Sequence, residues 1–429
     1  MNTALADRIS QEHAAASASL PAGVVSRERR LRAVETLAVA GMPTVRDENW
    51  KYANLRPLEK VRFAPRAHRG AAEISLADLP ALLEGCSRYT FVDGVFAPEL
   101  STAGAQAGIT VRTAVSTAVT PVTNPDTRLT LLNDAFATDA ASIHVARGTD
   151  CPGCIEVVFV ASDEADKAAS YPRLELRVDS DAKLGLIERH VSFGSDANFV
   201  NTAIDVRLER GASVDHYRIQ QAGARAIWLD TLTASVAQSA SYRLYAVNLG
   251  SLSGRSTIHT QLDGEGAEFE LRAVSLAAQR QVHDTYALVE HAAPNTRSDQ
   301  SFRGIASERA RTAFNSKVVV RKGAHRADSH QSLRGLLAGP EAEIDVRPQL
   351  EIYTDDVRCN HGATTGKLDD QMLFYLLSRG IDRDTAQRLL KWAFLEDVVS
   401  KIPVPELRRQ IELSLAGQLQ ETIALKELL

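Results

Sequence analysis

The chemically most active residue types lie close together near residue 360. Asp355, Asp356, Cys359 and His361 fall within one short polar segment. Cys359 and His361 are two residues apart, so in an extended segment their side chains point the same way. A thiolate and an imidazole on one face are suitable ligands for iron or zinc. Two ligands do not close a site, so others must come from elsewhere or from a partner. The alternative is a buried cysteine beside a hydrogen-bonded histidine at a domain junction.

Cys151 and Cys154 form a CxxC motif. No second CxxC and no HxxxH is present to complete a zinc site. The motif precedes an apolar strand rather than opening a clear helix, which argues against a thioredoxin-like redox role. We therefore expect a turn that carries two incidental thiols.

Further histidines and carboxylates are weaker candidates for metal binding or acid–base chemistry. One group consists of His283, Asp284 and His291, and another of His325, Asp328 and His330. Neither group is a closed ligand set, so we expect solvated or hydrogen-bonded side chains. Paired carboxylates could serve acid–base chemistry, but helix capping accounts for Asp369 and Asp370. The GxSxG and HExxH motifs are both absent from the sequence.

The segment 362–368 has the composition of a phosphate-binding loop without its spacing. Three residues separate its glycines, and Leu368 follows the lysine. The loop requires four residues between the glycines and Ser or Thr after the lysine. We therefore expect no ATP binding of this kind.

Composition points to a folded protein of the cytoplasm. Of the 429 residues, 44% are hydrophobic and 24% charged, and the net charge of -5 gives no global basic surface for nucleic acid. No apolar run is long enough for a membrane-spanning helix. Residues 1–22 lack a basic region followed by an apolar run, so we expect no secretory signal. Four cysteines in such a long chain do not make a disulfide framework, which favours a reducing cytoplasm.

Short β-like runs dominate from about residue 128 and alternate with turn residues. A small or turn-forming residue followed by alanine recurs before several of these runs. The alanines are Ala182, Ala212, Ala240 and Ala267, at intervals of 30, 28 and 27 residues. Such a period is typical of a solenoid whose coils stack closely at one corner. A β-sandwich is the alternative.

Helical patterns flank this β region. Ser26 can cap a helix that ends at Gly41, and three amphipathic helices follow residue 350, the last with Pro405 at its first position. We therefore divide the chain into an N-terminal helical or irregular domain (1–125), a β core (126–350) and a C-terminal helical domain (351–429).

Several segments resemble the SufB/SufD family of iron–sulfur cluster assembly proteins. They are the sequences at 313–320, 350–353, 356–366 and 373–380, and the aromatic motif at 50–55. The resemblance implies a right-handed parallel β-helix core between helical domains. It implies a non-catalytic subunit that pairs with a SufB-like paralogue and binds a SufC-like ATPase through its C-terminal helices. Isolated, the chain could form a homodimer.

The same resemblance places Cys359 and His361 on the family's Cys-x-His pair. His361, and less directly Cys359, are then candidate ligands for iron or a transient iron–sulfur cluster at the interface with the paralogue, and the isolated chain holds no tight cofactor. The small number of cysteines favours a supporting role over a complete scaffold site. The motif at 151–154 is not part of the family pattern and receives no function.

Two other functions compete with this one. A β-helix enzyme acting on polysaccharides needs clustered carboxylates along one β face, and no Asp-rich strand repeat is present. A zinc-binding structural protein would use Cys151, Cys154 and a distant His or Cys pair, and would hold its metal tightly.

Overall fold

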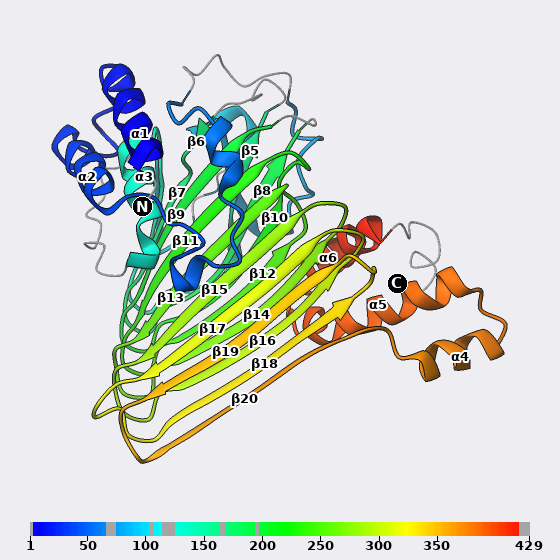
Figure 1. Cartoon of the computed structure of the whole chain (residues 1–429). Coiled ribbons are helices and arrows are strands. Elements are labelled where there is room, and N and C mark those ends of the chain that lie inside the picture. Colours follow the sequence, from blue (N-terminus) through cyan, green and yellow to red (C-terminus); the bar gives the residue numbers. More distant parts are fainter. Residues whose placement is uncertain are drawn as a thin grey trace.

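The computed structural model describes residues 3–65, 74–102, 104, 106–113, 125–162, 169–193 and 197–419. Its strands form two long sheets that face each other (Figure 1). In the described residues the first sheet has the order β2 (Val95–Phe96), β1 (Cys86–Val92), β5 (Asp150–Ala161), β8 (Lys183–Ser192), β10 (Ser213–Gln221), β12 (Ser241–Asn248), β14 (Glu268–Ala277), β16 (Arg297–Ala306), β18 (Ala327–Leu337) and β20 (Val357–Gly366).

The second sheet contains the strands that alternate with these along the chain. Its order over the described residues is β19 (Glu343–Ile352), β17 (Arg311–Val320), β15 (Val282–His291), β13 (Ser253–Leu262), β11 (Ile227–Val236), β9 (Phe199–Leu208), β7 (Arg173–Val178), β4 (Ala141–Val145) and β3 (Ile109–Thr113), with β6 (Ala169–Ser170) beside β9. From β7 and β8 onward the chain visits the two sheets in turn, and each strand pairs in parallel with its neighbours. This winding is a parallel β-solenoid, which confirms the repeat fold over the sandwich.

The recurring alanines mark one corner of this solenoid. Each follows a residue in the left-handed region of φ, where the chain turns into a strand of the first sheet. The turn residues are Asp181 (φ 60°), Gly211 (71°), Ser239 (55°) and Gly266 (70°). The alanines are Ala182, Ala212, Ala240 and Ala267, each at most 1% exposed. A small side chain is needed here because successive coils stack directly on one another.

Helices lie at both ends of the chain, as predicted. They are α1 (Thr3–Ala16), α2 (Arg27–Ala40), α3 (Leu129–Phe136), α4 (Asp370–Ser378), α5 (Arg383–Val399) and α6 (Pro405–Gln418), with the short helices η1 (Glu48–Trp50), η2 (Arg56–Lys60), η3 (Pro98–Leu100) and η4 (Pro125–Thr127). Ser26 caps α2, Asp369 caps α4 and Asp382 caps α5 through their side chains. None of the described helices is long and apolar enough to cross a membrane.

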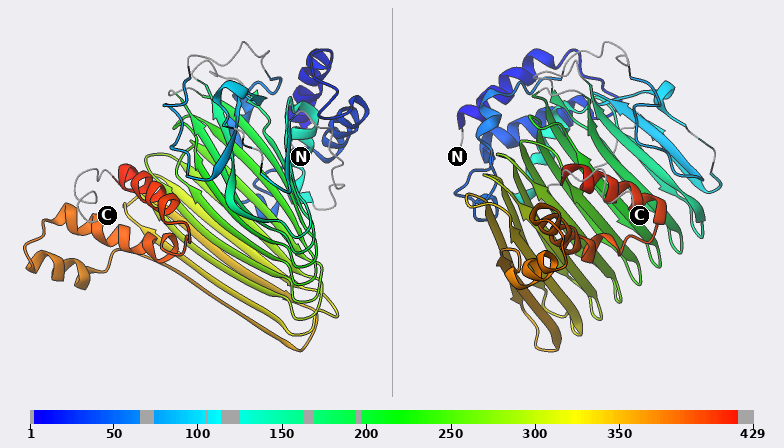
Figure 2. Two further views of the ribbon diagram at one scale, coloured as in Figure 1. Left: turned by 180° about the vertical axis from the view of Figure 1, so that it is seen from behind. Right: turned by 90° about the vertical axis from the view of Figure 1, so that its right-hand side faces the viewer.

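The N-terminal and C-terminal helices pack on different sheets. Helices α1 to α3 form an apolar cluster with Phe199 and Leu229 of the second sheet. Helices α5 and α6 lie across the outside of the first sheet (Figure 2), where Leu395 and Leu407 pack with Tyr217. Helix α4 projects away from this body (Figure 1).

The sheets extend beyond the expected core of residues 126–350 at both ends. Strand β1 pairs in register with β5, and β20 pairs in register with β18. The predicted bounds followed the onset of short β-like runs near residue 128 and the helical pattern after residue 350, and they therefore left β1 and β20 outside the core.

The interior of the solenoid holds buried polar groups among its apolar side chains. The carboxylate of Glu188 lies 2.5 Å from His190 Nε2 and 2.9 Å from His216 Nε2. His216 Nδ1 lies 2.9 Å from the hydroxyl of Tyr242. Burial lowers the pKa of His216. A neutral His216 can therefore donate to Glu188 and accept from Tyr242, which satisfies all three buried groups.

The buried histidines predict a pH-dependent stability. Burial lowers the pKa of His283 to about 4, whereas the unfolded side chain keeps its ordinary value of 6.5. Below about pH 6.5 His283 therefore binds a proton in the unfolded state but stays neutral in the folded state. The free energy of unfolding falls as the pH drops. The contribution of His283 lost between pH 7 and pH 5 is about 2 kcal/mol. Urea unfolding at pH 7 and pH 5 gives the free energy of unfolding at each pH. Between the two pH values His283→Asn should lose correspondingly less of this free energy than the wild type.

The matched control is His325→Asn, because His325 is exposed. Its loss of unfolding free energy between pH 7 and pH 5 should equal that of the wild type. If His283→Asn also loses as much as the wild type, the buried imidazole does not carry this pH dependence. The comparison uses the change with pH, so a general loss of stability from the substitution does not affect it.

Candidate functional site

The last coil of the solenoid is open. Strand β20 ends the first sheet and β19 ends the second, and no strand of the described part of the chain pairs with their outer edges. Both strands are ten residues long. Long unpaired edges of this kind readily pair with another chain. Ile344, Val346 and Leu350 of β19 are only half-buried, because no further coil covers them.

Cys359 and His361 share one face of β20, as their spacing predicts, and that face is the inner one. In the register of β18 and β20, Cys359 lies opposite Ser329 and His361 opposite Gln331. Ser329 and Gln331 are fully buried inside the solenoid, so their neighbours on β20 face the same interior. Cys359 is half-buried and His361 is exposed. The pair therefore lies at the mouth of the interior, where a partner can reach it.

The two side chains differ in their surroundings. Burial, with the nearby carboxylate of Asp328, raises the pKa of the Cys359 thiol. A metal that binds this sulfur must displace its proton. His361 has no hydrogen-bond or ion-pair partner in the part of the chain that the structure describes. Its ring nitrogens are therefore available to an incoming ligand.

A hydrogen-bonded group of polar side chains lies directly behind His361. Gln331 Nε2 donates to the hydroxyl oxygen of Ser316 at 2.5 Å, and the Ser316 hydroxyl donates to Gln300 Oε1 at 2.7 Å. These three side chains are fully buried. His361 thus continues a polar layer of the interior at the point where the coil stack ends.

The described residues contain no group of three or more His, Cys, Asp or Glu side chains that could hold a metal ion. Within the described chain, Cys359 and His361 are therefore not part of such a group.

The other histidine groups are hydrogen-bonded, as expected. His283 Nδ1 lies 3.1 Å from the Ser275 hydroxyl, and His291 Nδ1 lies 2.8 Å from that of Thr296. Asp284 pairs with Arg255.

The second group lies on the surface. There His325 contacts Thr354, and His330 contacts Asn360.

Residues 362–366 belong to the extended strand β20. In this conformation they do not form a loop around a phosphate.

The expectation of a turn with two incidental thiols at Cys151 and Cys154 is wrong, because both residues lie in strand β5 and Cys154 is not a free thiol. A disulfide joins Cys154 to Cys86, 68 residues away, and Cys151 remains free. Sequence reasoning missed Cys86, because only the register of β1 against β5 brings the two cysteines together. With Cys154 in this bond, the zinc site built on Cys151 and Cys154 loses one of its thiolates.

Helix α4 exposes an apolar surface. Phe374 is 72% exposed, Tyr375 52% and Met372 51%, whereas Leu373 is buried. The sequence predicted an apolar stripe on this helix. In the structure Leu376 and Leu377 are half-buried, whereas Met372 and Phe374 are exposed together with Tyr375, and an exposed apolar patch of this kind is typical of a docking surface.

Comparison with known proteins agrees with this architecture. Residues 159–394 match the family described as SUF system FeS cluster assembly, SufBD core domain. The iron–sulfur cluster assembly protein SufD of Escherichia coli is 29% identical over 382 residues, which cover 88% of this chain and 89% of that protein. An iron–sulfur cluster assembly SufBD family protein of Synechocystis is 27% identical over 403 residues, 89% of each chain.

A plant protein shows a shorter match. The chloroplastic protein ABCI7 of Arabidopsis thaliana is 28% identical over 298 residues, which cover 67% of this chain and 62% of that protein. The segment that matches the SufBD core spans more than half of the chain and includes both Cys359 and His361. This protein therefore belongs to the SufB/SufD family of iron–sulfur cluster assembly proteins.

Proposed function

We propose that this protein is the SufD-like subunit of a cytoplasmic assembly complex, in which it pairs with a SufB-like paralogue and binds a SufC-like ATPase. Family membership supplies the general role in iron–sulfur cluster assembly. The observation that carries the proposal is the open last coil, which presents Cys359 and His361 beside two unpaired strand edges. In this role the chain supports iron delivery and cluster formation without catalysing a reaction itself.

A paralogue with the same fold fits the open coil well. Its own terminal strands would continue both sheets by pairing with β19 and β20. The half-buried side chains of Val346 and Leu350 would then become fully buried. A second copy of this chain could occupy the same edges when the paralogue is absent, which accounts for the expected homodimer of the isolated protein.

Iron is the cargo of this interface rather than a resident cofactor. The imidazole of His361 and the thiol of Cys359 are donor types that suit iron. The remaining donors would come from the facing surface of the paralogue, so that a complete site exists only in the complex. We accordingly expect the isolated chain to purify without tightly bound metal, and we expect neither nucleic acid nor membrane as a partner.

The exposed apolar surface of α4 is the proposed contact for the ATPase. Phe374 and Met372 lie on a helix that projects from the body of the protein. Side chains of this type form the buried anchors of many protein interfaces. Contact at α4 would leave the open coil free for the paralogue.

Replacement of His361 tests the metal role. The chain is co-expressed with its neighbouring assembly proteins, and iron and sulfide are measured after anaerobic reconstitution. His361→Ala should leave complex formation unchanged, because the proposed pairing rests on the backbone edges of β19 and β20, and because His361 has no hydrogen-bond partner among the described residues. Its loss as a ligand should lower iron affinity by about tenfold or more.

The matched control for this test is His330→Ala. His330 is also exposed but contacts Asn360, and it lies on the adjacent strand β18. The control complex should load iron like the wild type. Equal loading of the His361 variant would make that residue structural only. Failure of the wild-type chain to form a complex would refute the proposed pairing.

Replacement of Phe374 tests the ATPase contact. Phe374→Ser removes the most exposed of the aromatic side chains on α4 and should weaken ATPase binding by about tenfold or more. Isothermal titration with the purified ATPase gives the affinity. Val39→Ser serves as the control, since Val39 is 82% exposed on α2 at the other end of the chain. Equal affinities of the two variants would show that α4 does not form this contact.

A further inference from the structure

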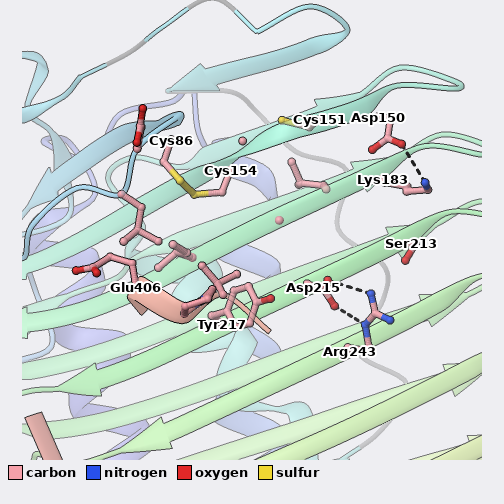
Figure 3. Close-up of a pocket in the computed structure, with 18 residues that line it drawn as sticks. Cys86, Asp150, Cys151, Cys154, Lys183, Ser213, Asp215, Tyr217, Arg243 and Glu406 are labelled. Atoms are coloured by element: carbon pink, nitrogen blue, oxygen red, sulfur yellow. Dashed lines mark hydrogen bonds and ion pairs between the residues drawn. A yellow bond between two sulfur atoms is a disulfide. The ribbon is translucent and has the colours of Figure 1, made fainter. Parts of the chain in front are cut away.

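The disulfide of Cys86 and Cys154 lines a pocket between the solenoid and the C-terminal helices (Figure 3). The pocket has a volume of about 630 Å³ and borders β1, β5, β8, β10 and the start of α6. Its lining includes Leu83, Cys86, Cys154, Tyr217 and Pro405. Both cysteines therefore line a space large enough for a small molecule or an inserted side chain.

The surrounding backbone is built for a close approach of the two cysteines. Cys86 and Cys154 lie directly opposite each other in the parallel register of β1 and β5, with Cα atoms 4.4 Å apart. This distance lies within the range of disulfide-bonded cysteines. Gly153 has no side chain to keep the strands apart, since a Cβ there would lie 2.0 Å from the carbonyl oxygen of Gly85.

Gly185 of β8 leaves space beside the disulfide on the side away from β1. Gly185 occupies the position next to Cys154 in the following coil, and it also lines the pocket. A Cβ at Gly185 would lie 3.4 Å from the Cβ of Cys154. Any longer side chain at this position would crowd the sulfur, so its absence leaves the disulfide open toward the pocket.

The segment that Cys86 anchors also contacts α6. The backbone carbonyl of Ala81 accepts a hydrogen bond from Gln410 Nε2 of α6 at 3.1 Å. Leu83 belongs to the same apolar cluster as Leu407 of α6. The same Gln410 side chain accepts from Arg189 of β8 at 2.6 Å. The disulfide thus ties residues 81–86 to the solenoid, and α6 packs against this segment.

We propose that Cys86 and Cys154 form a reversible disulfide, which small thiols and dithiols open through this pocket, and that its state controls how firmly α6 is held. Cys151 also lines the pocket, but it is a free thiol whose sulfur donates to Gln106 Oε1 at 2.8 Å. The inference does not depend on the partners proposed above.

The reaction is an ordinary thiol–disulfide exchange. The thiolate of a reductant attacks one sulfur and forms a mixed disulfide, while the other cysteine leaves as a thiolate and takes up a proton. A second thiolate of the reductant then releases the first cysteine. In total the disulfide gains two electrons and two protons, and the reductant becomes a disulfide. An oxidised small disulfide drives the reverse reaction by the same steps.

The test uses the full-length protein without denaturant. Samples are equilibrated in buffers of reduced and oxidised dithiothreitol or glutathione and are then alkylated. Intact mass spectrometry gives the number of alkylated thiols in each sample. The number of reactive cysteines should change reversibly from four to two, and peptide mapping should identify Cys86 and Cys154 as the pair. Hydrogen exchange should become severalfold faster in residues 80–86 and in α6 when the disulfide opens.

Two variants serve as matched controls. Cys151→Ser should keep the full redox response. Cys86→Ser/Cys154→Ser should exchange like the reduced wild type in both buffers. The wild-type comparison alone remains informative if the double variant does not fold. The proposal is overturned if four thiols persist under oxidising conditions, if reduction requires prior unfolding, or if exchange in α6 is the same in both states.

Discussion

The in-register stacking of parallel coils is the constraint on which every other feature depends. Side chains alternate between the two faces of a strand, so a slip of one residue would turn the interior of the solenoid outward. The register of β18 and β20 places His361 beside the buried Gln331. The register of β1 and β5 places Cys86 beside Cys154. The backbone ladder therefore sets what each site faces: it turns Cys359 and His361 toward the interior, and it brings together Cys86 and Cys154, which are 68 residues apart.

The two ends of the coil stack are closed to different degrees. At the N-terminal side each sheet ends in a short antiparallel strand: β2 has two residues and β3 has five. At the other side each sheet ends in a parallel strand of ten residues. Short edge strands offer few backbone groups to another chain, whereas long ones invite pairing. Within the described chain, the longer unpaired edges therefore belong to the last coil, which bears Cys359 and His361.

Local sequence signals predicted the parts of the structure that depend on local geometry. The turn residues before Ala182 and Ala240 indicated the solenoid, and Ser26 and Pro405 indicated helix starts, because each depends only on its own backbone conformation. The common orientation of Cys359 and His361 followed from their spacing. The disulfide of Cys86 and the exposure of Phe374 were not predictable, since both depend on which distant elements lie beside them.

The C-terminal helices connect the two ends of the solenoid. The chain leaves the open coil at β20, passes through α4 and returns along the first sheet in α5 and α6 (Figure 2). Arg303 of β16 pairs with Asp397 of α5, and Gln410 of α6 contacts the segment beside Cys86. Coupling between distant sites requires an element with two discrete states. The disulfide of Cys86 and Cys154, which we propose to open and close beside α6, is such an element. It lies near α6, at the opposite end of the C-terminal helices from α4.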